Sequence, residues 1–116
     1  MIYIASPYTH KNKKVMQQRY EEVVALCAYL AKEGHSVYSP IAHWHLIAEK
    51  YDLPKDDAWW RILDEDMIIV AKQLWVLMLE GWRTSRGVKR EILFAKNNTI
   101  RVKYIQIRKG GYKCIT

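Results

Sequence analysis

Short apolar runs and longer segments of helical periodicity alternate along this chain. The run Leu74–Leu79 is continuously apolar, which is typical of a strand buried on both faces of a parallel sheet. In the segment 12–33, apolar side chains recur at i, i+3, i+4, i+7 and i+8, which predicts a helix that ends at Gly34. The side chains of this stripe are Val23, Leu26, Cys27, Leu30 and Ala31. Similar patterns predict strands over 2–5, 36–39 and 100–107, and helices over 56–72 and 85–97.

Three other segments are less regular. Residues 42–51 fit either a short helix or an ordered loop. Residues 100–107 alternate apolar and charged side chains, which indicates an edge strand or a strand with one half-exposed face. The glycine-containing tail at 109–111 is expected to be loose. For the helix over 56–72, the expected apolar anchors are Trp59, Ile62, Leu63, Met67 and Val70.

Strands that alternate with helices predict a parallel sheet joined by right-handed crossovers. A chain of 116 residues forms one domain, so we expect a single unit over 1–116. The expected fold is α/β, a three-layer flavodoxin-like or Rossmann-like domain with a four- to five-stranded parallel sheet.

Composition favours a cytoplasmic protein with no membrane partner. No apolar run approaches the roughly 20 residues that a membrane-spanning helix needs. The apolar run at the amino terminus is also too short for a signal peptide. Cys27 falls on a predicted core helix and Cys114 near the tail, so we expect neither a disulfide framework nor a metal site.

The net charge of +7 is distributed unevenly. Residues 81–116 hold ten Lys or Arg against one acid, a net of +9, which leaves −2 for residues 1–80. A basic segment fits a phosphate-bearing ligand, a nucleic acid or a solvated surface. We rank nucleic-acid binding last, because aromatic residues are barely interleaved with these charges. Neither a GxGxxG motif nor a P-loop is present, and no cofactor is expected.

The strongest chemical signal lies in the helix after the Leu74–Leu79 strand. Ser85 is a good N-cap, and the first-turn amides of this helix point toward any bound anion. Gly87 leaves room for a ligand near the backbone. Glu91 borders the apolar face, where partial desolvation raises a carboxyl pKa. The alternative for Glu91 is a surface carboxylate paired with a nearby Lys or Arg.

Two turns at the expected carboxyl edge of the sheet add further candidates, because open α/β sheets bind ligands there. The turn before the Ser85 helix contributes Gly81 and Trp82, and Trp82 is the tryptophan that we expect to stack on a base. The turn after the first strand contributes Ser6, Pro7 and Tyr8. The phenol of Tyr8 can orient a carboxylate or a sugar hydroxyl.

Acidic and histidine clusters complete the candidate set. Asp64, Glu65 and Asp66 cannot all share one helical face, so at least one should border the apolar stripe. A carboxylate there, close to Glu91, would form an acid/base pair of the glycosidase kind, whereas helix solvation explains the other two. His43 and His45 are two residues apart and do not face each other on a helix, so a shared metal is not expected. They fit either a loop that reaches over the site or an ordinary polar loop.

Several of these segments together resemble a known family. The segments are YIASPYT, GHSVYSPIAHWH, the W-x-x-x-D of Trp60–Asp64, and LWVLMLEGWRTSRGVKREILFA. They resemble the DUF1937 family, which is similar to nucleoside 2-deoxyribosyltransferases and deoxynucleoside 5′-monophosphate N-glycosidases. The resemblance covers about residues 2–96 and is most specific at GW-x-x-S-x-G-V-x-x-E.

The resemblance implies roles for individual residues. Glu91 would be the nucleophile that attacks C1′ of the deoxyribose, and Asp64 would assist the base and the sugar. Ser85 would bind the 5′ group, and Tyr8 matches a tyrosine that follows the first strand. The implied reaction cleaves the N-glycosidic bond of a nucleoside or nucleotide through a covalent Glu–sugar intermediate.

Other interpretations remain open at this stage. Exclusion of water would make the enzyme a transferase, and entry of water would make it a hydrolase. A homodimer or higher homo-oligomer is expected from the resemblance. A nucleotide-binding module without catalytic activity is the alternative function.

Overall fold

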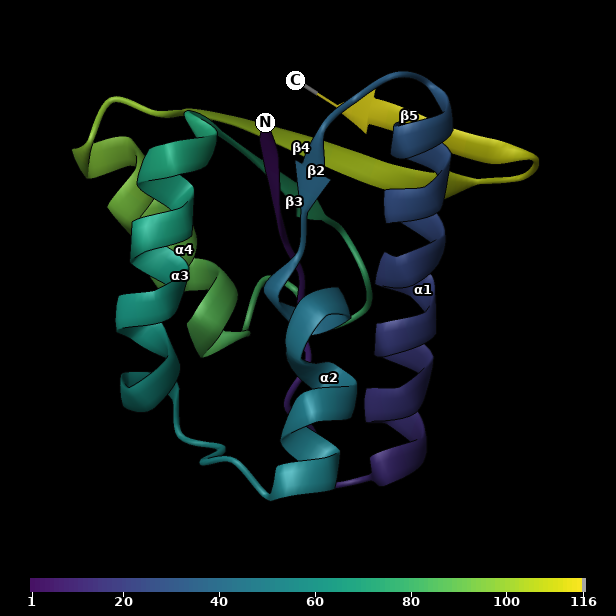
Figure 1. The fold of residues 1–116 in the computed structure, drawn as a ribbon. Coiled ribbons are helices and arrows are strands. Elements are labelled where there is room, and N and C mark those ends of the chain that lie inside the picture. The colour runs from purple at the N-terminus through teal and green to yellow at the C-terminus, as the bar shows by residue number, and fades with distance from the viewer. Residues whose placement is uncertain (116) are drawn as a thin grey trace.

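The computed structural model describes residues 1–115, which form four helices and one five-stranded sheet (Figure 1). The elements are β1 (Ile2–Ala5), α1 (Lys13–Lys32), β2 (Val37–Tyr38), α2 (Pro40–Tyr51), α3 (Asp57–Ala71), β3 (Gln73–Leu77), α4 (Arg86–Asn97), β4 (Arg101–Arg108) and β5 (Gly111–Ile115). The predicted alternation of strands and helices is confirmed, with one additional strand at the end of the chain.

The strand order is β2-β1-β3-β4-β5. Strands β1 to β4 run parallel, and β1 pairs with β2 on one side and β3 on the other. The chain leaves β1 in one direction to form β2 and later returns to form β3 on the opposite side. The carboxyl ends of β1 and β3 therefore flank the point where the strand order reverses, which is where open α/β sheets bind ligands.

The expectation of a purely parallel sheet was wrong, because β5 runs antiparallel to β4. Arg108 pairs with Gly111 across a turn that contains only Lys109 and Gly110. So short a connection can join only antiparallel strands, since a parallel pair needs a long crossover. The expected loose tail at 109–111 is therefore part of a hairpin, and β4 is an inner strand with partners on both sides.

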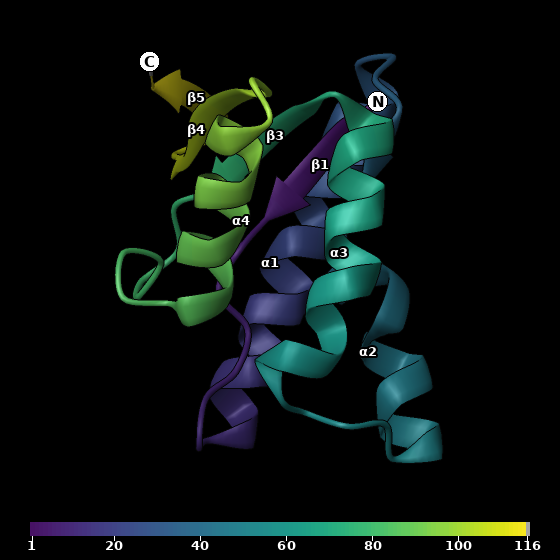
Figure 2. The same cartoon turned by 90° about the vertical axis from the view of Figure 1, so that its left-hand side faces the viewer.

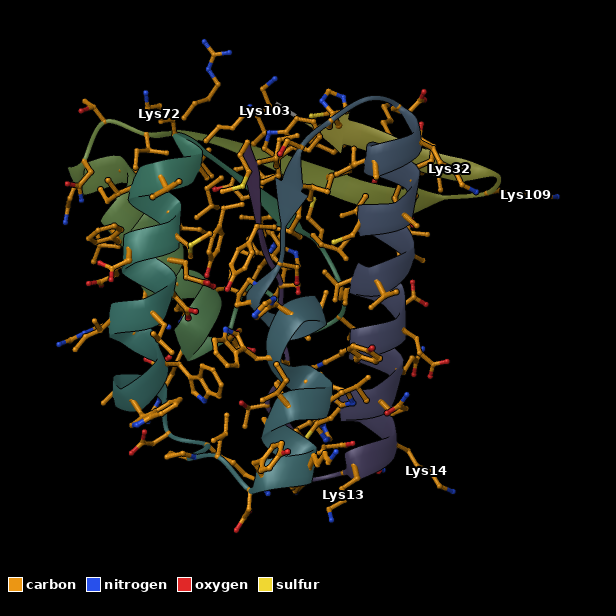
Figure 3. The ribbon with its side chains drawn as sticks, viewed as in Figure 1. Lys13, Lys14, Lys32, Lys72, Lys103 and Lys109 are labelled. Atoms are coloured by element: carbon orange, nitrogen blue, oxygen red, sulfur yellow. The ribbon has the colours of Figure 1, made fainter. Side chains whose placement is uncertain are left out.

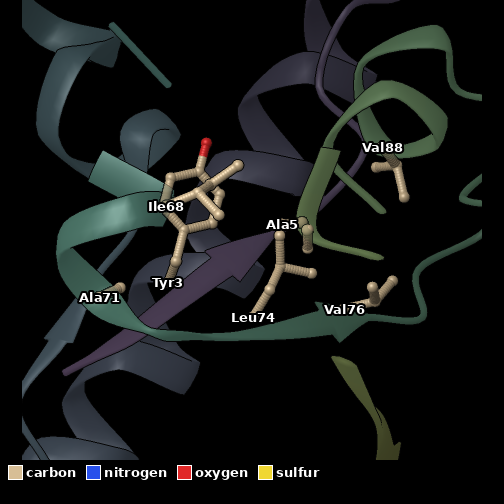
Figure 4. Packing of buried hydrophobic residues seen from close by; sticks show 8 residues of the cluster. Tyr3, Ala5, Ile68, Ala71, Leu74, Val76 and Val88 are labelled. Carbon is tan, nitrogen blue, oxygen red and sulfur yellow. The ribbon is translucent and has the colours of Figure 1, made fainter. Parts of the chain in front are cut away.

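Helices cover both faces of the sheet (Figure 2). Side chains alternate along β1, so that Tyr3 and Ala5 face α3 and α4, whereas Ile2 and Ile4 face α1. The first face is drawn in Figure 4, where Ile68 of α3 packs beside Tyr3. A phenol is thus fully buried within an otherwise apolar cluster, and its hydroxyl requires a partner there.

The predicted anchors of α3 were wrong at Trp59, Ile62 and Val70, which are exposed. The helix instead turns Asp64, Ile68 and Ala71 toward the sheet, at i, i+4 and i+7. The buried face of α3 contains the carboxyl group of Asp64, so a prediction from apolar periodicity alone assigned the wrong side of the helix to the core. The solvent-facing side of α3 carries apolar side chains among charged ones, with Ile62 65% exposed.

Residues 40–51 form a helix, which is one of the two alternatives predicted for 42–51, so His43 and His45 do not lie on a loop. Ser39 is its N-cap and accepts a hydrogen bond from the Ala42 amide, and Pro40 occupies the first turn. The predicted helix stop at Gly34 is confirmed. Its φ is +90°, and the His35 amide donates to the carbonyl of Leu30 in a Schellman arrangement.

Some of the lysine side chains lie at the edges of the sheet. Lys72 and Lys103 project from the edge formed by the amino ends of the strands, and Lys109 extends from the β4–β5 turn (Figure 3). Within residues 1–115, no helix is both long enough and apolar enough to cross a membrane.

Candidate active site

Glu91 lies in the second turn of α4 and points toward the sheet. Val88 and Ala95 flank it on the buried face of the helix, and the residue is only 5% exposed. The phenol of Tyr3, which is fully buried on β1, donates a hydrogen bond to Oε2 of Glu91. This contact joins residues 88 positions apart in the sequence and fixes the carboxyl group over β1.

Burial raises the pKa of Glu91 to about 8. The negative charge of Asp64 contributes to this rise in the pKa of Glu91, whereas the hydrogen bond from Tyr3 and the charge of Arg90 offset part of it. The predicted desolvation of Glu91 is therefore confirmed. The interpretation as a surface carboxylate was wrong, because the side chain is buried.

Asp64 on α3 is the second buried carboxyl group, at 6% exposed. Its Oδ2 lies 3.2 Å from Nη2 of Arg90. Arg90 also holds Asp57 in a bidentate pair, with Nη2–Oδ1 at 2.8 Å and Nε–Oδ2 at 3.0 Å. Burial raises the pKa of Asp64 to about 6, and the contacts with Arg90 counteract that rise. Among the three consecutive acids, Asp64 is thus the one that borders the apolar stripe, as one of them was expected to do.

Two buried carboxyl groups with different elevated pKa values can share one proton near neutral pH. With the values above, the doubly ionised pair appears only above about pH 8, and the doubly protonated pair only below about pH 6. Between these limits one proton remains on the pair. It resides mainly on Glu91, whose pKa is the higher, and the form with ionised Glu91 and protonated Asp64 is the minor one. Such a pair offers a nucleophile and a proton donor side by side.

Two polar atoms of this group, Oδ1 of Asp64 and Nη1 of Arg90, are buried without a hydrogen-bond partner within residues 1–115. Oγ of Ser6, which follows β1, is also buried and unpaired. Native proteins satisfy nearly all of their buried polar groups, so the unpaired atoms of Asp64 and Arg90 call for a ligand or water. The set includes donors and acceptors and suits a ligand with hydroxyl groups and ring nitrogens.

Aromatic side chains line one side of the carboxyl pair. The ring of Tyr38, after β2, lies 5.9 Å from that of Tyr3 and 5.8 Å from that of His43. Trp44 continues the series at 4.8 Å from His43 and meets Trp60 of α3 at 5.7 Å. Helices α2 and α3 therefore present flat apolar rings toward each other beside the acidic groups, which suits a heteroaromatic ligand.

Tyr8 and His45 lie in a separate cluster. The Tyr8 hydroxyl is 2.5 Å from Nδ1 of His45, and His45 is buried beneath it. The tyrosine that contacts Glu91 is therefore Tyr3, within β1, and not Tyr8 after it. His43 is exposed and belongs to the aromatic side of the carboxyl pair.

The remaining predicted residues lie around the start of α4 and the end of β1. Ser85 caps α4 as predicted, with its Oγ accepting from the Val88 amide at 3.3 Å. Gly87 follows in the first turn, where an added Cβ would lie 3.7 Å from Oδ1 of Asp57. Trp82 is half-buried and packs against Tyr104, at 5.5 Å between ring centroids. Pro7 is fully buried beside Ser6.

Arg19 of α1 joins the two loops at the carboxyl edge of the sheet. Its Nη1 donates to the carbonyl of Thr9 at 3.1 Å, and its Nη2 donates to the carbonyl of Glu80 at 3.1 Å. Gly81 has a φ of +89°, and a Cβ there would lie 2.9 Å from Nη2 of Arg19. The β1–α1 loop and the β3–α4 loop are thus held together by one guanidinium group.

We expect Gly81→Ala to lower the free energy of unfolding by about 2–3 kcal/mol, through backbone strain and loss of an Arg19 hydrogen bond. Gly110→Ala is the matched control, because Gly110 also has a positive φ, of +81°, but has open space around it. Strain alone should cost that variant about 1–2 kcal/mol. Urea denaturation measures both, and equal losses would contradict the role of Arg19.

Sequence reasoning did not identify Tyr3, Tyr38, Asp57 or Arg90. The only signal for Tyr3 was a phenol inside an apolar strand. For Asp57 and Arg90, the available signals were two acids seven residues apart on α3 and a basic residue adjacent to Glu91. None of these patterns indicates by itself which groups meet in space.

Within the described part of the chain, no cluster of three or more His, Cys, Asp or Glu side chains could hold a metal ion. Residues 1–106 match the family described as "Domain of unknown function (DUF1937)". No curated protein matches the chain.

Proposed function

The chain belongs to the DUF1937 family, whose function is unknown, so we propose an activity from the geometry of the site itself. We propose that the protein cleaves the N-glycosidic bond of a 2′-deoxynucleoside or its 5′-monophosphate. Glu91 attacks C1′ and forms a covalent glycosyl intermediate, while the departing base takes a proton from the pair that Glu91 forms with Asp64. The reaction needs no metal or organic cofactor.

The observation that carries this proposal is the buried Glu91–Asp64 pair with Tyr3 directed at Glu91. A fully ionised pair would be costly in such surroundings, and a pair without function would be replaced by apolar residues at a gain in stability. Its place beside the carboxyl ends of β1 and β3, next to unpaired polar atoms and aromatic rings, supports a nucleoside-like ligand. The strand order supports the finer flavodoxin-like classification that we propose for the parallel part of the sheet.

The N-terminus of α4 supports a place for the 5′ group of the substrate. Ser85 and the first-turn amides flank Gly87, and helix N-termini favour anionic groups such as phosphate. The intermediate can be transferred to a second base or hydrolysed by water. Adding a second base as acceptor distinguishes the two outcomes, because only transfer yields a new nucleoside.

The test is to incubate the purified protein with each common 2′-deoxynucleoside and its 5′-monophosphate and to follow free base by liquid chromatography. Parallel reactions contain a second base as acceptor. Base release establishes glycosyl cleavage, and a new nucleoside that appears only with the acceptor establishes transfer. If no base is released but a nucleotide raises the melting temperature, the protein is a binding module without catalytic activity.

We expect kcat/KM to follow a bell-shaped dependence on pH, with limbs near 6 and 8. The active form of the pair holds one proton, which is lost above the higher pKa and joined by a second below the lower pKa. Initial rates between pH 5 and 9.5 at constant ionic strength measure the profile. A rate that rises continuously to pH 9.5 would contradict a shared proton.

We further propose that the protein forms a homodimer or higher homo-oligomer. The support is the exposed apolar side of α3, where Trp59, Ile62, Ile69 and Val70 face outward. Patches of this kind are typical of surfaces that another protein covers. Light scattering coupled to size-exclusion chromatography measures the mass in solution directly.

A further inference from the structure

Arg90 presents an unpaired donor on the edge that faces Asp64. Asp57 occupies another edge of the planar guanidinium group, with Nε–Oδ2 at 3.0 Å and Nη2–Oδ1 at 2.8 Å. The second hydrogen of Nη2 lies on the edge that Nη2 shares with Nη1, and Nη2 also donates to Oδ2 of Asp64 at 3.2 Å. Asp64 therefore lies at the Nη1–Nη2 edge. Nη1 on this edge is buried and has no hydrogen-bond partner within residues 1–115.

Asp64 leaves a free oxygen in the same contact. Its side chain is 8% exposed, and Oδ2 is the oxygen that accepts from Arg90. Oδ1 is buried and has no partner in the part of the chain that the structure describes. An arginine and a carboxylate commonly form two parallel hydrogen bonds, but this contact forms one of the two. A single ligand that contacts both Oδ1 and Nη1 would satisfy the two buried atoms.

These two atoms adjoin the proposed nucleophile. Arg90 precedes Glu91 in α4, and α4 packs beside α3, which carries Asp64 (Figure 2). The phenol of Tyr3 donates to Glu91 and also lies beside Asp64. At the other edge of Arg90, the side chain of Asp57 is 43% exposed, so the cluster reaches solvent there. A ligand that Glu91 attacks is therefore within reach of the free atoms of Asp64 and Arg90.

A flat ring borders the same groups and favours a base, rather than a sugar hydroxyl, as their ligand. Burial raises the pKa of Tyr38, and the negative charges of Asp64 and Glu91 add to this rise, so the Tyr38 hydroxyl lies near both carboxyl groups. The Tyr38 ring is half-buried and lies 5.9 Å from the ring of Tyr3. Aromatic faces stack on planar heteroaromatic rings, and the edge of a base stacked here would meet Oδ1 and Nη1.

The protonation state of Asp64 determines which base edge fits. In the reactive form of the pair Glu91 is ionised and Asp64 holds the proton, which lies on Oδ1 because Oδ2 accepts from Arg90. Oδ1–H and Nη1–H are then two adjacent donors. They complement a ring nitrogen beside a carbonyl oxygen, as in N7 and O6 of a 6-oxopurine or N3 and O2 of cytosine. Adenine has an amino group beside N7, and thymine has an N–H beside each carbonyl, so either base would set a donor against a donor.

We propose that Asp64 and Arg90 together select the leaving base, and that they select bases with a ring nitrogen and a carbonyl oxygen as adjacent acceptors, an inference that rests on the proposed function. Nη1 of Arg90 donates to the carbonyl oxygen. Oδ1 of Asp64 gives its proton to the ring nitrogen while the bond between C1′ and the base breaks, its electron pair stays on the base, and an oxygen of Glu91 bonds to C1′. Binding of such a base also favours the reactive form of the pair, because only protonated Asp64 can donate to the nitrogen.

Calorimetry with base analogues tests this selection without relying on catalysis. One pair of probes is 9-methylhypoxanthine and 9-methylpurine, which lacks the carbonyl oxygen. The other pair is 1-methylcytosine and 1-methylthymine, in which N3 carries a hydrogen. The methyl group stands in for the sugar and keeps the acceptor nitrogen free. We expect 9-methylhypoxanthine or 1-methylcytosine to bind about 10- to 100-fold more tightly than its partner probe, the usual scale for a matched base contact. The pair that shows the difference identifies the base as a 6-oxopurine or cytosine.

Arg90→Lys removes the Nη1 donor and keeps a positive charge beside Asp57 and Asp64. We expect this variant to lose the preference, so that the two dissociation constants of a probe pair agree within about threefold. Arg101→Lys, at an exposed position where β4 begins, is the matched control and should keep the wild-type ratio.

The wild-type comparison is decisive even if Arg90→Lys fails to fold. Equal affinities within both pairs of probes, no binding of any probe at millimolar concentration, or a folded Arg90→Lys protein that keeps the preference overturns the inference. Base release from deoxynucleosides is measured separately. Release without a preference leaves the proposed function standing, whereas a preference without release by the wild-type protein refutes the proposed activity and leaves the selection of a base by Asp64 and Arg90.

Discussion

Glu91→Gln should abolish base release while leaving a folded and more stable protein. The amide retains the shape of the side chain and can accept the hydrogen bond from Tyr3, but it cannot attack C1′. We expect turnover to fall by about 10⁴-fold or more, as is usual when a covalent nucleophile is removed. The variant should also show no burst and no glycosyl adduct by intact mass spectrometry.

The stability of this variant follows from the pKa of Glu91. The folded-state pKa of about 8 lies above the reference value of 4.5, so the folded protein holds a proton that the unfolded chain releases. The wild-type protein therefore loses stability as pH rises from about 4.5 to about 8, and the loss is on the order of a few kcal/mol. Gln does not titrate, so its advantage should be small at pH 4.5 and largest near pH 8.5.

Urea denaturation of both proteins at pH 4.5, 6.5 and 8.5 measures this difference. Glu21→Gln, at an exposed position of α1, is the control for removal of a carboxyl group and should show little dependence on pH. A Glu91→Gln variant that is destabilised at every pH would mean that the carboxylate is well accommodated in the fold. Undiminished base release by the same variant would remove Glu91 from the role of nucleophile.

The arrangement of strands and helices could be predicted from sequence because it depends on local patterns. Leu74–Leu79 has no polar residue, and the stripe from Val23 to Leu30 has helical spacing, so each pattern admits one structure. Glu91 could be singled out for the same reason, as the single acid beside the apolar face of α4 and after the capping Ser85. The antiparallel β5 was not predicted, because the prediction was based on alternating strands and helices and β5 follows β4 without a helix between them.

The partners of the candidate residues could not be predicted, because they depend on tertiary packing. The contact between Tyr3 and Glu91 brings together β1 and α4, and nothing near Tyr3 in the sequence favours it over Tyr8. The face of α3 was misjudged for a related reason. Asp64 takes an inward position where Arg90 pairs with it, and that compensation is visible only in three dimensions.

Asp64→Asn should separate the two carboxyl groups by function. The amide can still accept a hydrogen bond from Arg90, but it cannot take part in the shared proton. We expect kcat/KM on ordinary substrates to fall by about 100-fold, the usual scale for loss of a general acid. Removal of the Asp64 charge should also lower the pKa of Glu91, because that charge helps to raise it. The pH profile should therefore lose its alkaline limb and keep a single ionisation, below pH 8, above which the nucleophile is active.

A comparison of substrates with different leaving bases tests most directly whether Asp64 donates a proton. 7-Methyl-2′-deoxyguanosine carries a cationic base that departs without being protonated, so its cleavage should be nearly unaffected by Asp64→Asn and still abolished by Glu91→Gln. Asp66→Asn, two residues further along α3 at an exposed position, is the matched control and should behave as wild type. Equal losses on both substrates would mean that Asp64 positions Arg90 and Glu91 and supplies no proton. Rescue by the cationic base would assign the two halves of the bond cleavage to two different side chains, attack at C1′ to Glu91 and protonation of the base to Asp64.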